Sequence, residues 1–239
     1  MQLGFRIAVW NANGVSQKFN EIEIIVKNNY IDIFLLCETH LNSRLHLKIR
    51  GYDLVIANHP DNRYHTGAAI LIKSTIKYEI SEPFIKPSIQ AAGIRVKFNN
   101  SFYNLYSLYT PPKHTINCQD YESSFDKLGN RFLVVGDFNT KHPWWWSGII
   151  NPRGRQLYNC IQKKRFSVLS GGRPTYWPTD SAKIPVLLVF AIYSGIPRNM
   201  LDILNNEDWS SDHTALVINF RPSIELIPKK VKLFHQKLI

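Results

Sequence analysis

The sequence predicts an α/β protein in which two packed sheets form the centre of one domain and helices cover their outer faces. Apolar strand-like runs alternate with amphipathic helical segments, and hairpins occur among the strands. No internal repeat or low-complexity linker divides the chain. Its 239 residues, 44% of them hydrophobic, are enough for one large domain with a substantial core.

The first half of the chain begins with a strand, a helix and a second strand. We expect these at Phe5–Trp10, Ser16–Asn28 and Ile31–Cys37, and the continuous apolar run of the last suits burial on both faces. Short strands and one hairpin around Asn99-Asn100 should follow, at Asp53–Ala57, Gly67–Ile72, Ile76–Ile80, Ile89–Phe98 and Ser101–Tyr109.

The second half continues the alternation of strands and helices. We expect helices at Cys118–Leu128 and Arg153–Lys164, the latter with a basic C-terminal end that the helix dipole favours. Strands should lie at Arg131–Val135, Phe166–Leu169, Leu187–Ile192 and Ala215–Phe220. The pattern weakens from about Arg221, so we place the domain at residues 1–221. Residues 222–239 are expected to be a basic tail or truncated linker, or else a docked terminal segment.

The charge balance predicts a polyanionic partner. Lys and Arg number 29 against 18 Asp and Glu, which gives a formal net charge of +11. Phosphates release counterions when Lys and Arg replace them, so nucleic acid is the first candidate and an anionic membrane the second. The alternative is a basic protein without such a partner.

The cysteines and the apolar segments predict a soluble intracellular protein. Cys37, Cys118 and Cys160 are far apart, and the lack of a CxxC pair argues against zinc and against a disulfide framework. Met1 leads almost directly into a strand-like run, without the features of a signal peptide. The longest apolar stretch, Ile184–Ile196, is too short to span a bilayer.

Four short polar clusters follow apolar strands, where an α/β scaffold presents reactive groups. They are Trp10–Gly14, Cys37–His40, Gly136–Asn139 and Ser210–His213. A single Asp-x-Asn is more often a turn or a helix cap than a ligand. The joint occurrence of the four clusters is much more specific than any one of them.

These clusters contain the groups that a metal-assisted hydrolysis needs. Glu38 can supply a carboxylate to Mg²⁺, and Asn11 can orient a metal-bound water. Asp137 beside Asn139 can bind and deprotonate a nucleophilic water, and His213 can stabilise charge that develops on a phosphoryl oxygen. No Ser or Cys lies in a recognisable nucleophile setting, which favours direct attack by water.

The order of these residues resembles the endonuclease/exonuclease/phosphatase superfamily, which includes pancreatic-type deoxyribonuclease and the major apurinic endonuclease. The matching residues are Asn11, Glu38, Tyr109, Asp137-Phe138-Asn139 and Ser211-Asp212-His213. A closer resemblance is to the endonuclease domain of non-LTR (LINE-type), jockey-like retrotransposons. It is carried by Trp10–Gly14, Leu108–Pro111, Gly136–His142, Trp144–Trp146 and Ala191–Ile196. The resemblance runs from about Arg6 to Phe220.

The resemblance implies a fold, a cofactor and a role. The fold would be a four-layer α/β sandwich, the cofactor Mg²⁺ with Mn²⁺ as a substitute, and the site of action the nucleus. The domain would nick double-stranded DNA, and the new 3′-hydroxyl would prime a separate reverse transcriptase module. Asn11 and Glu38 would lie in the metal site, Tyr109 would contact the scissile phosphate, and Asp212 would orient His213 toward that phosphate.

Several residues are candidates for contact with DNA. Thr175 lies where the family has a Thr that contacts phosphate or DNA, and Trp144 in the run Trp144–Trp146 could pack against a groove or a base. Lys141, His142, Arg153 and Arg155 flank this loop and could contact phosphates. A solvated basic surface is the alternative for any one of these charged residues, and we favour packing of at least two of the three tryptophans in the core. The segment Ile192–Asn199 is expected to form a surface hairpin.

The chain departs from the family at one expected carboxylate. In the strand before the final Ser-Asp-His, the residue preceding the aromatic Phe190 is Val189, and Val186 replaces a frequent Asp after the proline. Losing a positioned acid–base group typically costs about 10²- to 10⁴-fold in rate. We therefore hypothesise a weak or inactive nuclease, unless Asp180 or Asp202 compensates, or unless the register assumed here is off and the strand's carboxylate lies elsewhere.

Three functions therefore remain in competition. The first is a retrotransposon-type endonuclease, impaired or intact. The second is a superfamily enzyme acting on abasic DNA, inositol phosphates or sphingomyelin, although the basic charge and the Trp-rich loop argue against the lipid enzymes. The third is a catalytically silent DNA-binding domain, which would bind DNA in a strongly salt-dependent way without cleaving it.

Overall fold

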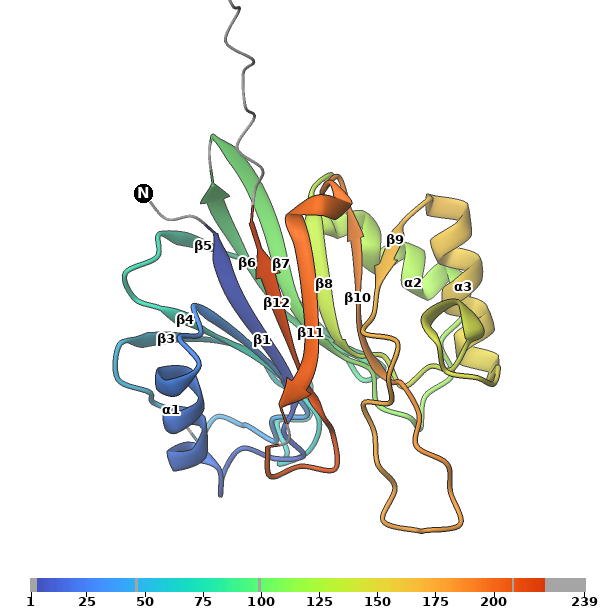
Figure 1. The fold of residues 1–239 in the computed structure, drawn as a ribbon, viewed down its shortest axis with the longest axis horizontal. Helices are drawn as coiled ribbons and strands as arrows, with labels where there is room; N and C mark the ends of the chain where they lie inside the picture. Colours follow the sequence, from blue (N-terminus) through green and yellow to red (C-terminus); the bar gives the residue numbers. More distant parts are fainter. Residues whose placement is uncertain (1–3, 46, 99, 208, 222–239) are drawn as a thin grey trace, which may run out of the picture.

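The computed structural model describes residues 4–45, 47–98, 100–207 and 209–221. Within these ranges two six-stranded sheets pack face to face and helices cover their outer faces, so the layers run helix, sheet, sheet, helix (Figure 1). This architecture confirms the predicted four-layer α/β sandwich. None of the helices in these ranges combines the length and the apolar character that a membrane crossing requires.

The first sheet contains the N-terminal and the C-terminal described strands and has the order β11-β12-β1-β2-β4-β3. Its strands are β1 (Phe5–Asn11), β2 (Ile33–Cys37), β3 (Tyr52–Ala57), β4 (Ala68–Lys73), β11 (Leu201–Glu207) and β12 (Ala215–Phe220). β1 and β2 run parallel, and the other neighbours are antiparallel. β2 and β12 are buried along their whole length, which explains why β2 is continuously apolar and why Asn219 is the only polar residue of β12.

The second sheet has the order β5-β6-β7-β8-β10-β9. Its strands are β5 (Tyr78–Lys86), β6 (Ile89–Phe98), β7 (Ser101–Tyr109), β8 (Phe132–Asp137), β9 (Ser167–Leu169) and β10 (Val189–Ser194). β6 and β7 form the predicted hairpin, and Asn100 at its turn has a φ of 62°, a left-handed conformation that Asn tolerates. β7 and β8 run parallel.

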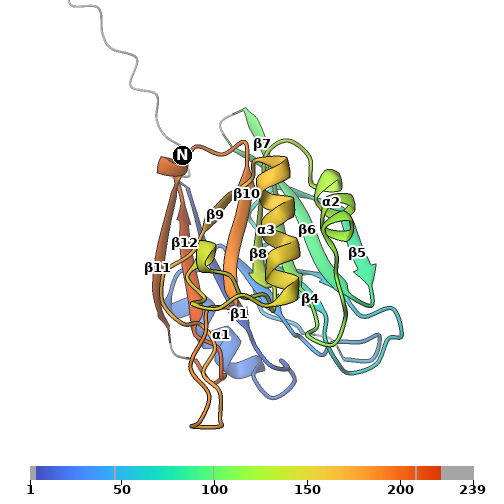
Figure 2. The same ribbon diagram turned by 90° about the vertical axis from the view of Figure 1, so that its right-hand side faces the viewer.

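Three helices in the described ranges form the outer layers: α1 (Phe19–Asn28), α2 (Cys118–Phe125) and α3 (Pro152–Lys164). α1 covers the first sheet, and α2 and α3 cover the second (Figure 2). Asn117 begins α2 with a reciprocal capping box to Asp120, and the side chain of Asn151 caps α3. Short 3₁₀ turns lie at Asp126–Leu128, Pro143–Trp145 and Arg198–Met200.

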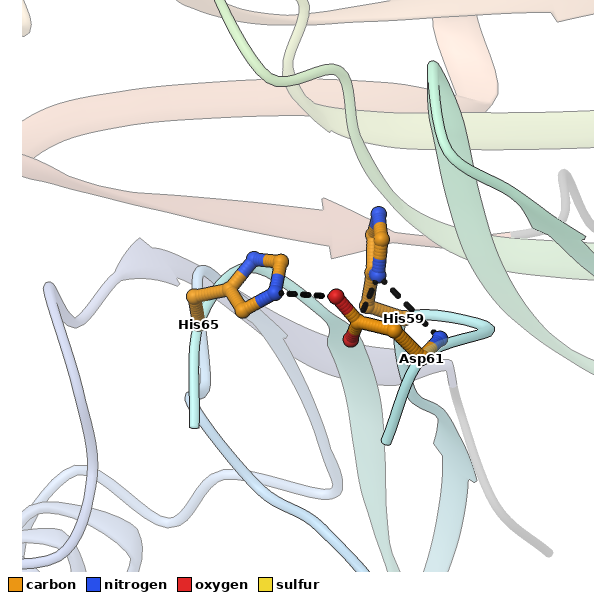
Figure 3. Close-up of side chains that lie close together, drawn as sticks. All are labelled: His59, Asp61 and His65. Carbon is orange, nitrogen blue, oxygen red and sulfur yellow. Dashed lines mark hydrogen bonds and ion pairs between the residues drawn. The ribbon is translucent and has the colours of Figure 1, made fainter. Parts of the chain in front are cut away.

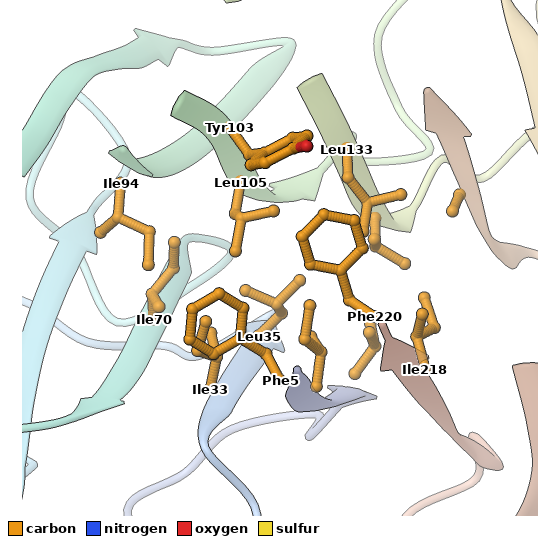
Figure 4. Packing of buried hydrophobic residues seen from close by; sticks show 14 of the residues in the cluster. Phe5, Ile33, Leu35, Ile70, Ile94, Tyr103, Leu105, Leu133, Ile218 and Phe220 are labelled. Atoms are coloured by element: carbon orange, nitrogen blue, oxygen red, sulfur yellow. The ribbon is translucent and has the colours of Figure 1, made fainter. Parts of the chain in front are cut away.

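The central apolar layer between the sheets holds the sandwich together. Phe5, Leu35 and Phe220 from the first sheet pack against Leu105 and Leu133 from the second (Figure 4). Two further apolar layers lie outside the sheets, one beneath α1 and one beneath α2 and α3. Each sheet therefore contributes both of its faces to apolar packing.

Two sequence-based expectations differ from the structure, and one falls outside it. β11 was not predicted, because an edge strand that leaves Asp202 and Leu204 exposed lacks a continuous apolar run. The expected surface hairpin at Ile192–Asn199 is wrong, because Ile192 and Tyr193 are buried in β10, which pairs with β8 and β9, and a 3₁₀ turn begins at Arg198. The expected basic tail at residues 222–239 lies outside the described residues.

The ends of several strands meet at one edge of the sandwich. Asn11 at the end of β1 is the register partner of Cys37 at the end of β2, and Tyr109 at the end of β7 is the partner of Asp137 at the end of β8. A loop closed by a bridge between Tyr176 and Val186 projects beyond this edge, in orange at the bottom of Figure 1. The polar clusters of the sequence therefore gather here.

Gly136 precedes Asp137 at the closest approach of β8 to β7. A Cβ atom at Gly136 would lie 1.8 Å from the carbonyl oxygen of Leu108. We expect Gly136→Ala to lower the free energy of unfolding by at least about 1–3 kcal/mol, because the backbone it meets cannot move aside without breaking the strand pairing. Urea denaturation measures this loss.

Gly148→Ala is the matched control. Gly148 has a left-handed φ of 71° but no other atom within 4 Å of the added Cβ, so only backbone strain of about 1 kcal/mol is expected. A loss for Gly136→Ala no greater than that of the control would contradict the steric explanation.

Candidate functional site

The polar clusters surround a cavity of about 440 Å³ at the shared edge of the sheets. The predicted residues that line it are Glu38, Tyr109, Asp137, Asn139, Lys141, Arg153, Asp212 and His213. Asn11 is fully buried and bonds to members of this group. Segments that are far apart in the sequence thus bring their polar side chains to one place.

The side-chain amide of Asn11 bridges two carboxylates. Its Nδ2 donates to Asp137 Oδ2 at 2.8 Å and to Glu38 Oε2 at 3.0 Å. Its Oδ1 accepts from the backbone N–H of Asn13 at 3.0 Å, which fixes the orientation of the amide. Asn11 therefore donates to both carboxylates and fixes their positions. The same amide could also orient a bound water.

Glu38 is held as a carboxylate directly after β2. Burial alone would raise its pKa, but hydrogen bonds from His40 and Asn11 favour the charged form, and the pKa is lowered overall. Its backbone φ of 51° is left-handed, which is uncommon for a residue other than glycine. The pKa of Tyr109 is raised well above its usual range by burial and by the Glu38 carboxylate, so its phenol keeps its proton and remains a donor.

The pKa of Asp137 is shifted in the opposite direction to that of Glu38. Its carboxyl is almost completely buried, and burial raises its pKa despite stabilisation by His213, by the backbone N–H of Asn139 and by Asn11. The Asn139 N–H donates to Asp137 Oδ1 at 2.8 Å, and Asn139 has a left-handed φ of 47°. A carboxylate with a raised pKa is a stronger proton acceptor, which suits a group that must deprotonate water.

His213 lies beside Asp137, and only the Nε2 atom of its ring has polar neighbours among the described residues. Its Nε2 is 3.4 Å from Asn11 Nδ2 and 3.9 Å from Asp137 Oδ2. Its Nδ1 is buried and has no hydrogen-bond partner among the described residues. The prediction that Asp212 orients this ring is wrong, because Asp212 Oδ1 instead accepts from Asn13 Nδ2 and Ser211 Oγ.

Val189 occupies the position next to this pair. β10 places Val189 directly opposite Asp137, and opposed residues of an antiparallel pair project from the same face. Val189 is fully buried in the central apolar layer. An aspartate at this position would therefore add a carboxylate beside Asp137.

No other residue of the strand and neither suggested acid replaces this carboxylate. The sequence of β10 contains no acid, and the alternative that the carboxylate lies elsewhere stays a prediction. Asp180 lies in the projecting loop and pairs with Lys183 at 3.7 Å. Asp202 on β11 is the register partner of Asn219 on β12, which in turn is the partner of Arg6 on β1. Arg6 lies five residues, or about 16 Å, along β1 from Asn11. Neither Asp180 nor Asp202 lines the cavity.

The donor set of the cavity fits a hard divalent cation. Glu38, Asp137 and Asp212 all line it, and oxygen ligands of this kind suit Mg²⁺ or Mn²⁺. A cation would offset the repulsion between carboxylates that share one cavity. Burial raises the pKa of the Cys37 thiol to about 12, so this nearby cysteine stays protonated and offers neither a thiolate ligand nor a nucleophile.

The tryptophan loop beside the cavity is more exposed than expected. Trp145 is fully buried, but Trp144 and Trp146 are 54% and 73% exposed. The expectation that at least two of the three tryptophans pack in the core is therefore wrong. The His142 ring stacks on Tyr158 with centroids 4.3 Å apart and accepts from the Trp144 N–H. Two indoles are thus presented to solvent next to the site.

The predicted DNA-contact residues divide into exposed and buried ones. Lys141 lines the cavity and Arg155 is exposed. Arg153 is buried and donates to the carbonyls of Pro111 and Thr110, so it holds the loop after β7 to α3.

Thr175 is also buried, and its Oγ1 accepts from the N–H groups of Leu188 and Val189, each at 2.9 Å. Contacts of these four residues with DNA stay predictions.

Three residues of the site were not assigned a role from the sequence. His40 bonds to Glu38, Asn13 bonds to Asp212, and the Tyr176 ring lies 4.9 Å from the His213 ring. His40 and Asn13 belong to the polar clusters, whose proximity to Glu38 and Asn11 was the available signal. Tyr176 had no such signal, because only the bridges of its loop to Val186 and His213 bring it to the cavity.

The raised pKa of Asp137 has a consequence for stability. A group that binds its proton more tightly in the folded state contributes stability below its unfolded pKa of 3.8, and this stability is lost as pH rises through the raised folded pKa. We therefore expect Asp137→Asn to raise Tm at pH 7 without added metal, with a smaller gain as pH approaches 3.8. Exposed Asp180→Asn is the control, and equal gains in both variants would contradict this explanation.

Comparison with known proteins agrees with this geometry. Residues 8–213 match the Endonuclease/Exonuclease/phosphatase family. The RNA-directed DNA polymerase from mobile element jockey of Drosophila melanogaster is 29% identical over 95% of the chain, and the probable RNA-directed DNA polymerase from transposon BS of the same species is 30% identical over 95%. The chain spans only about a quarter of these relatives, 25% and 26% of their lengths.

Solved structures share the fold. The endonuclease domain of TRAS1, a telomere-specific non-LTR retrotransposon, superimposes with a TM-score of 0.72 at 20% identity, over 91% of this chain and 98% of that one. The AP endonuclease LMAP from Leishmania major gives a TM-score of 0.74 at 13% identity, over 92% and 88%. The matched segment, the two-sheet fold and the polar cavity agree, and the chain belongs to the endonuclease/exonuclease/phosphatase family.

Proposed function

We propose that this domain is a magnesium-dependent endonuclease that nicks double-stranded DNA, with Mn²⁺ as a substitute ion. The proposal rests on the convergence of Glu38, Asp137 and His213 around one cavity, with Asn11 bridging the two carboxylates. The net charge of +11 supports a polyanionic substrate. The exposed Trp144 and the cavity-lining Lys141 offer a stacking surface and a cation beside the site.

The residues support hydrolysis by direct attack of water. Asp137 takes a proton from a water positioned beside Asn139, and the water oxygen attacks phosphorus. The bond from phosphorus to the 3′ oxygen breaks, and the departing oxygen takes a proton from solvent water, which leaves a 3′-hydroxyl and a 5′-phosphate. Tyr109 and His213 face the cavity as donors to phosphate oxygens. A divalent ion at Glu38 would supply charge neutralisation to the phosphate and the leaving oxygen.

We further propose that the nick primes reverse transcription at a genomic target in the nucleus. The support is the similarity to proteins named RNA-directed DNA polymerases, of which this chain spans about a quarter. A reverse transcriptase module would then belong to the same longer protein. The free 3′-hydroxyl left by the proposed cleavage is the group that such a polymerase extends.

A catalytically silent DNA-binding domain is the second candidate. The observation that favours it is Val189 beside Asp137, together with the unpartnered Nδ1 of His213. Without an acceptor on Nδ1, the ring lacks the second hydrogen bond that commonly sets the tautomer and orientation of a catalytic His. The basic residues proposed to contact DNA do not depend on residue 189, so the domain would still bind DNA without cleaving it.

The variant Val189→Asp distinguishes the two candidates. We expect it to raise the rate of supercoiled plasmid nicking in Mg²⁺ by about 10²- to 10⁴-fold, the usual effect of a positioned acid–base group. Val189→Asn is the matched control, since it adds a polar group of similar size without a charge. Full activity of the unaltered chain would overturn the hypothesis of impairment, and no nicking by either chain in Mg²⁺ or Mn²⁺ would favour the silent domain.

The DNA surface is tested separately from cleavage. Lys141→Gln should weaken binding of a duplex and reduce the slope of log affinity against log salt by about 1, the effect of one lost phosphate contact. Exposed Lys97 lies near Phe102 on the β6–β7 hairpin and does not line the cavity, so Lys97→Gln is the control and should leave the slope unchanged. Equal slopes for the two variants would contradict a phosphate contact by Lys141.

A further inference from the structure

The loop between β3 and β4 carries a compact cluster of metal-binding side chains outside the cavity. His59, Asp61 and His65 point toward one another from residues 58–67 (Figure 3). Each offers a ligand atom, and these three atoms lie within 4.8 Å of one another. The proposed catalysis uses none of these residues, and none of them lines the cavity.

One carboxylate lies between the two imidazoles. Asp61 Oδ1 is 2.7 Å from His59 Nδ1, and Asp61 Oδ2 is 2.9 Å from His65 Nε2. The imidazole rings lie 4.4 Å apart, centroid to centroid. The side chain of His59 is only 11% exposed, whereas those of Asp61 and His65 are 37% and 40% exposed. The cluster thus has a covered side and a side open to water.

The cluster is already close to the geometry of a three-ligand metal site. Zinc binds His nitrogen at about 2.0–2.1 Å and carboxylate oxygen at about 2.0–2.2 Å, so tetrahedral ligand atoms lie about 3.3 Å apart. The contact of Asp61 Oδ1 with His59 Nδ1 at 2.7 Å, or that of Asp61 Oδ2 with His65 Nε2 at 2.9 Å, would open by only about half an ångström if that oxygen became the ligand, and the remaining ligand atoms already lie within 4.8 Å of one another. The side open to water would leave a fourth position for a water molecule.

We propose that His59, Asp61 and His65 bind a borderline divalent transition metal of the Zn²⁺ type, at a site separate from the catalytic cavity. Two imidazoles with one carboxylate suit Zn²⁺ much better than Mg²⁺, which prefers oxygen ligands. The earlier expectation of no zinc site rested on the absence of a CxxC pair, and this set of ligands contains no cysteine.

The bound ion would steady the part of the protein that carries Glu38. The His40 N–H donates to the Thr66 carbonyl at 2.9 Å, and the Thr39 N–H donates to the Gly67 carbonyl at 3.3 Å. Asn62, which lies between Asp61 and His65 in the loop, accepts from the Ser43 N–H at 3.0 Å. Fixing the loop by a metal therefore restrains the segment that follows β2.

Titration calorimetry of the chelator-treated chain tests the site directly. We expect ZnCl₂ to bind in the variant Glu38→Gln, in which the catalytic cavity has lost a carboxylate, and MgCl₂ to give no binding at the loop. His65→Gln and Asp61→Asn in the same background should each weaken zinc binding by at least about 10-fold, since losing even an outer partner of a metal ligand costs that much. His114→Gln is the control for a histidine outside the cluster and should keep the affinity.

Two results would overturn the proposal. One is unchanged zinc affinity in both His65→Gln and Asp61→Asn, with folding verified by circular dichroism. The other is loss of all zinc binding in Glu38→Gln, which would assign the ion to the catalytic cavity. Neither result bears on nicking in Mg²⁺, so this proposal and the proposed function can fail independently.

Limited trypsin digestion gives a second readout that needs no affinity measurement. Arg63 lies between the ligands and is exposed, so trypsin can reach the bond that follows it. Zinc should slow cleavage after Arg63 severalfold in the chain and should have no effect in His65→Gln. Equal zinc effects in the two proteins would contradict a metal site formed by this loop.

Discussion

The hydrogen bonds from one buried amide, that of Asn11, join the two sheets at the site. Asn11 belongs to the first sheet, and it donates both to Glu38 after β2 and to Asp137 at the end of β8 in the second sheet. The two carboxylates can share a cavity because the amide lies between them, and the amide is fixed by the Asn13 N–H. The apolar layer between the sheets keeps these groups in register.

The two carboxylates differ because their surroundings differ. Hydrogen bonds from His40 and Asn11 lower the pKa of Glu38, whereas burial raises the pKa of Asp137. The first group stays ionised and suits a cation, and the second is a stronger proton acceptor. Two residues of the same chemistry therefore take different parts in the proposed hydrolysis.

Val189 suits the packing of the fold but offers no group for the proposed chemistry. A valine opposite Asp137 packs well in the central apolar layer and adds no charge beside two carboxylates. Nδ1 of His213 is buried without a partner among the described residues, and an unpaired buried polar group costs stability. The fold thus accommodates an apolar side chain directly opposite the buried Asp137.

Much of the site could be predicted from the sequence. The polar clusters stand at strand ends, and strand ends of neighbouring strands meet at one sheet edge, so Glu38, Asp137 and His213 could be identified without coordinates. The roles of Asp212, Asp180 and Asp202 were not predictable in this way. Sequence order does not say which acid faces His213, and the structure places none of the three against its Nδ1.

By itself the sequence determined the alternation of strands and helices, the basic charge, the polar clusters and the apolar Val189 directly before Phe190. These are properties of residue type and spacing. Only the tertiary structure decided which faces meet: that Arg153 and Thr175 are buried, that Trp144 is exposed, and that His59 and His65 come together around Asp61. Side-chain direction and burial depend on packing between segments distant in the chain, and local sequence patterns do not carry that information.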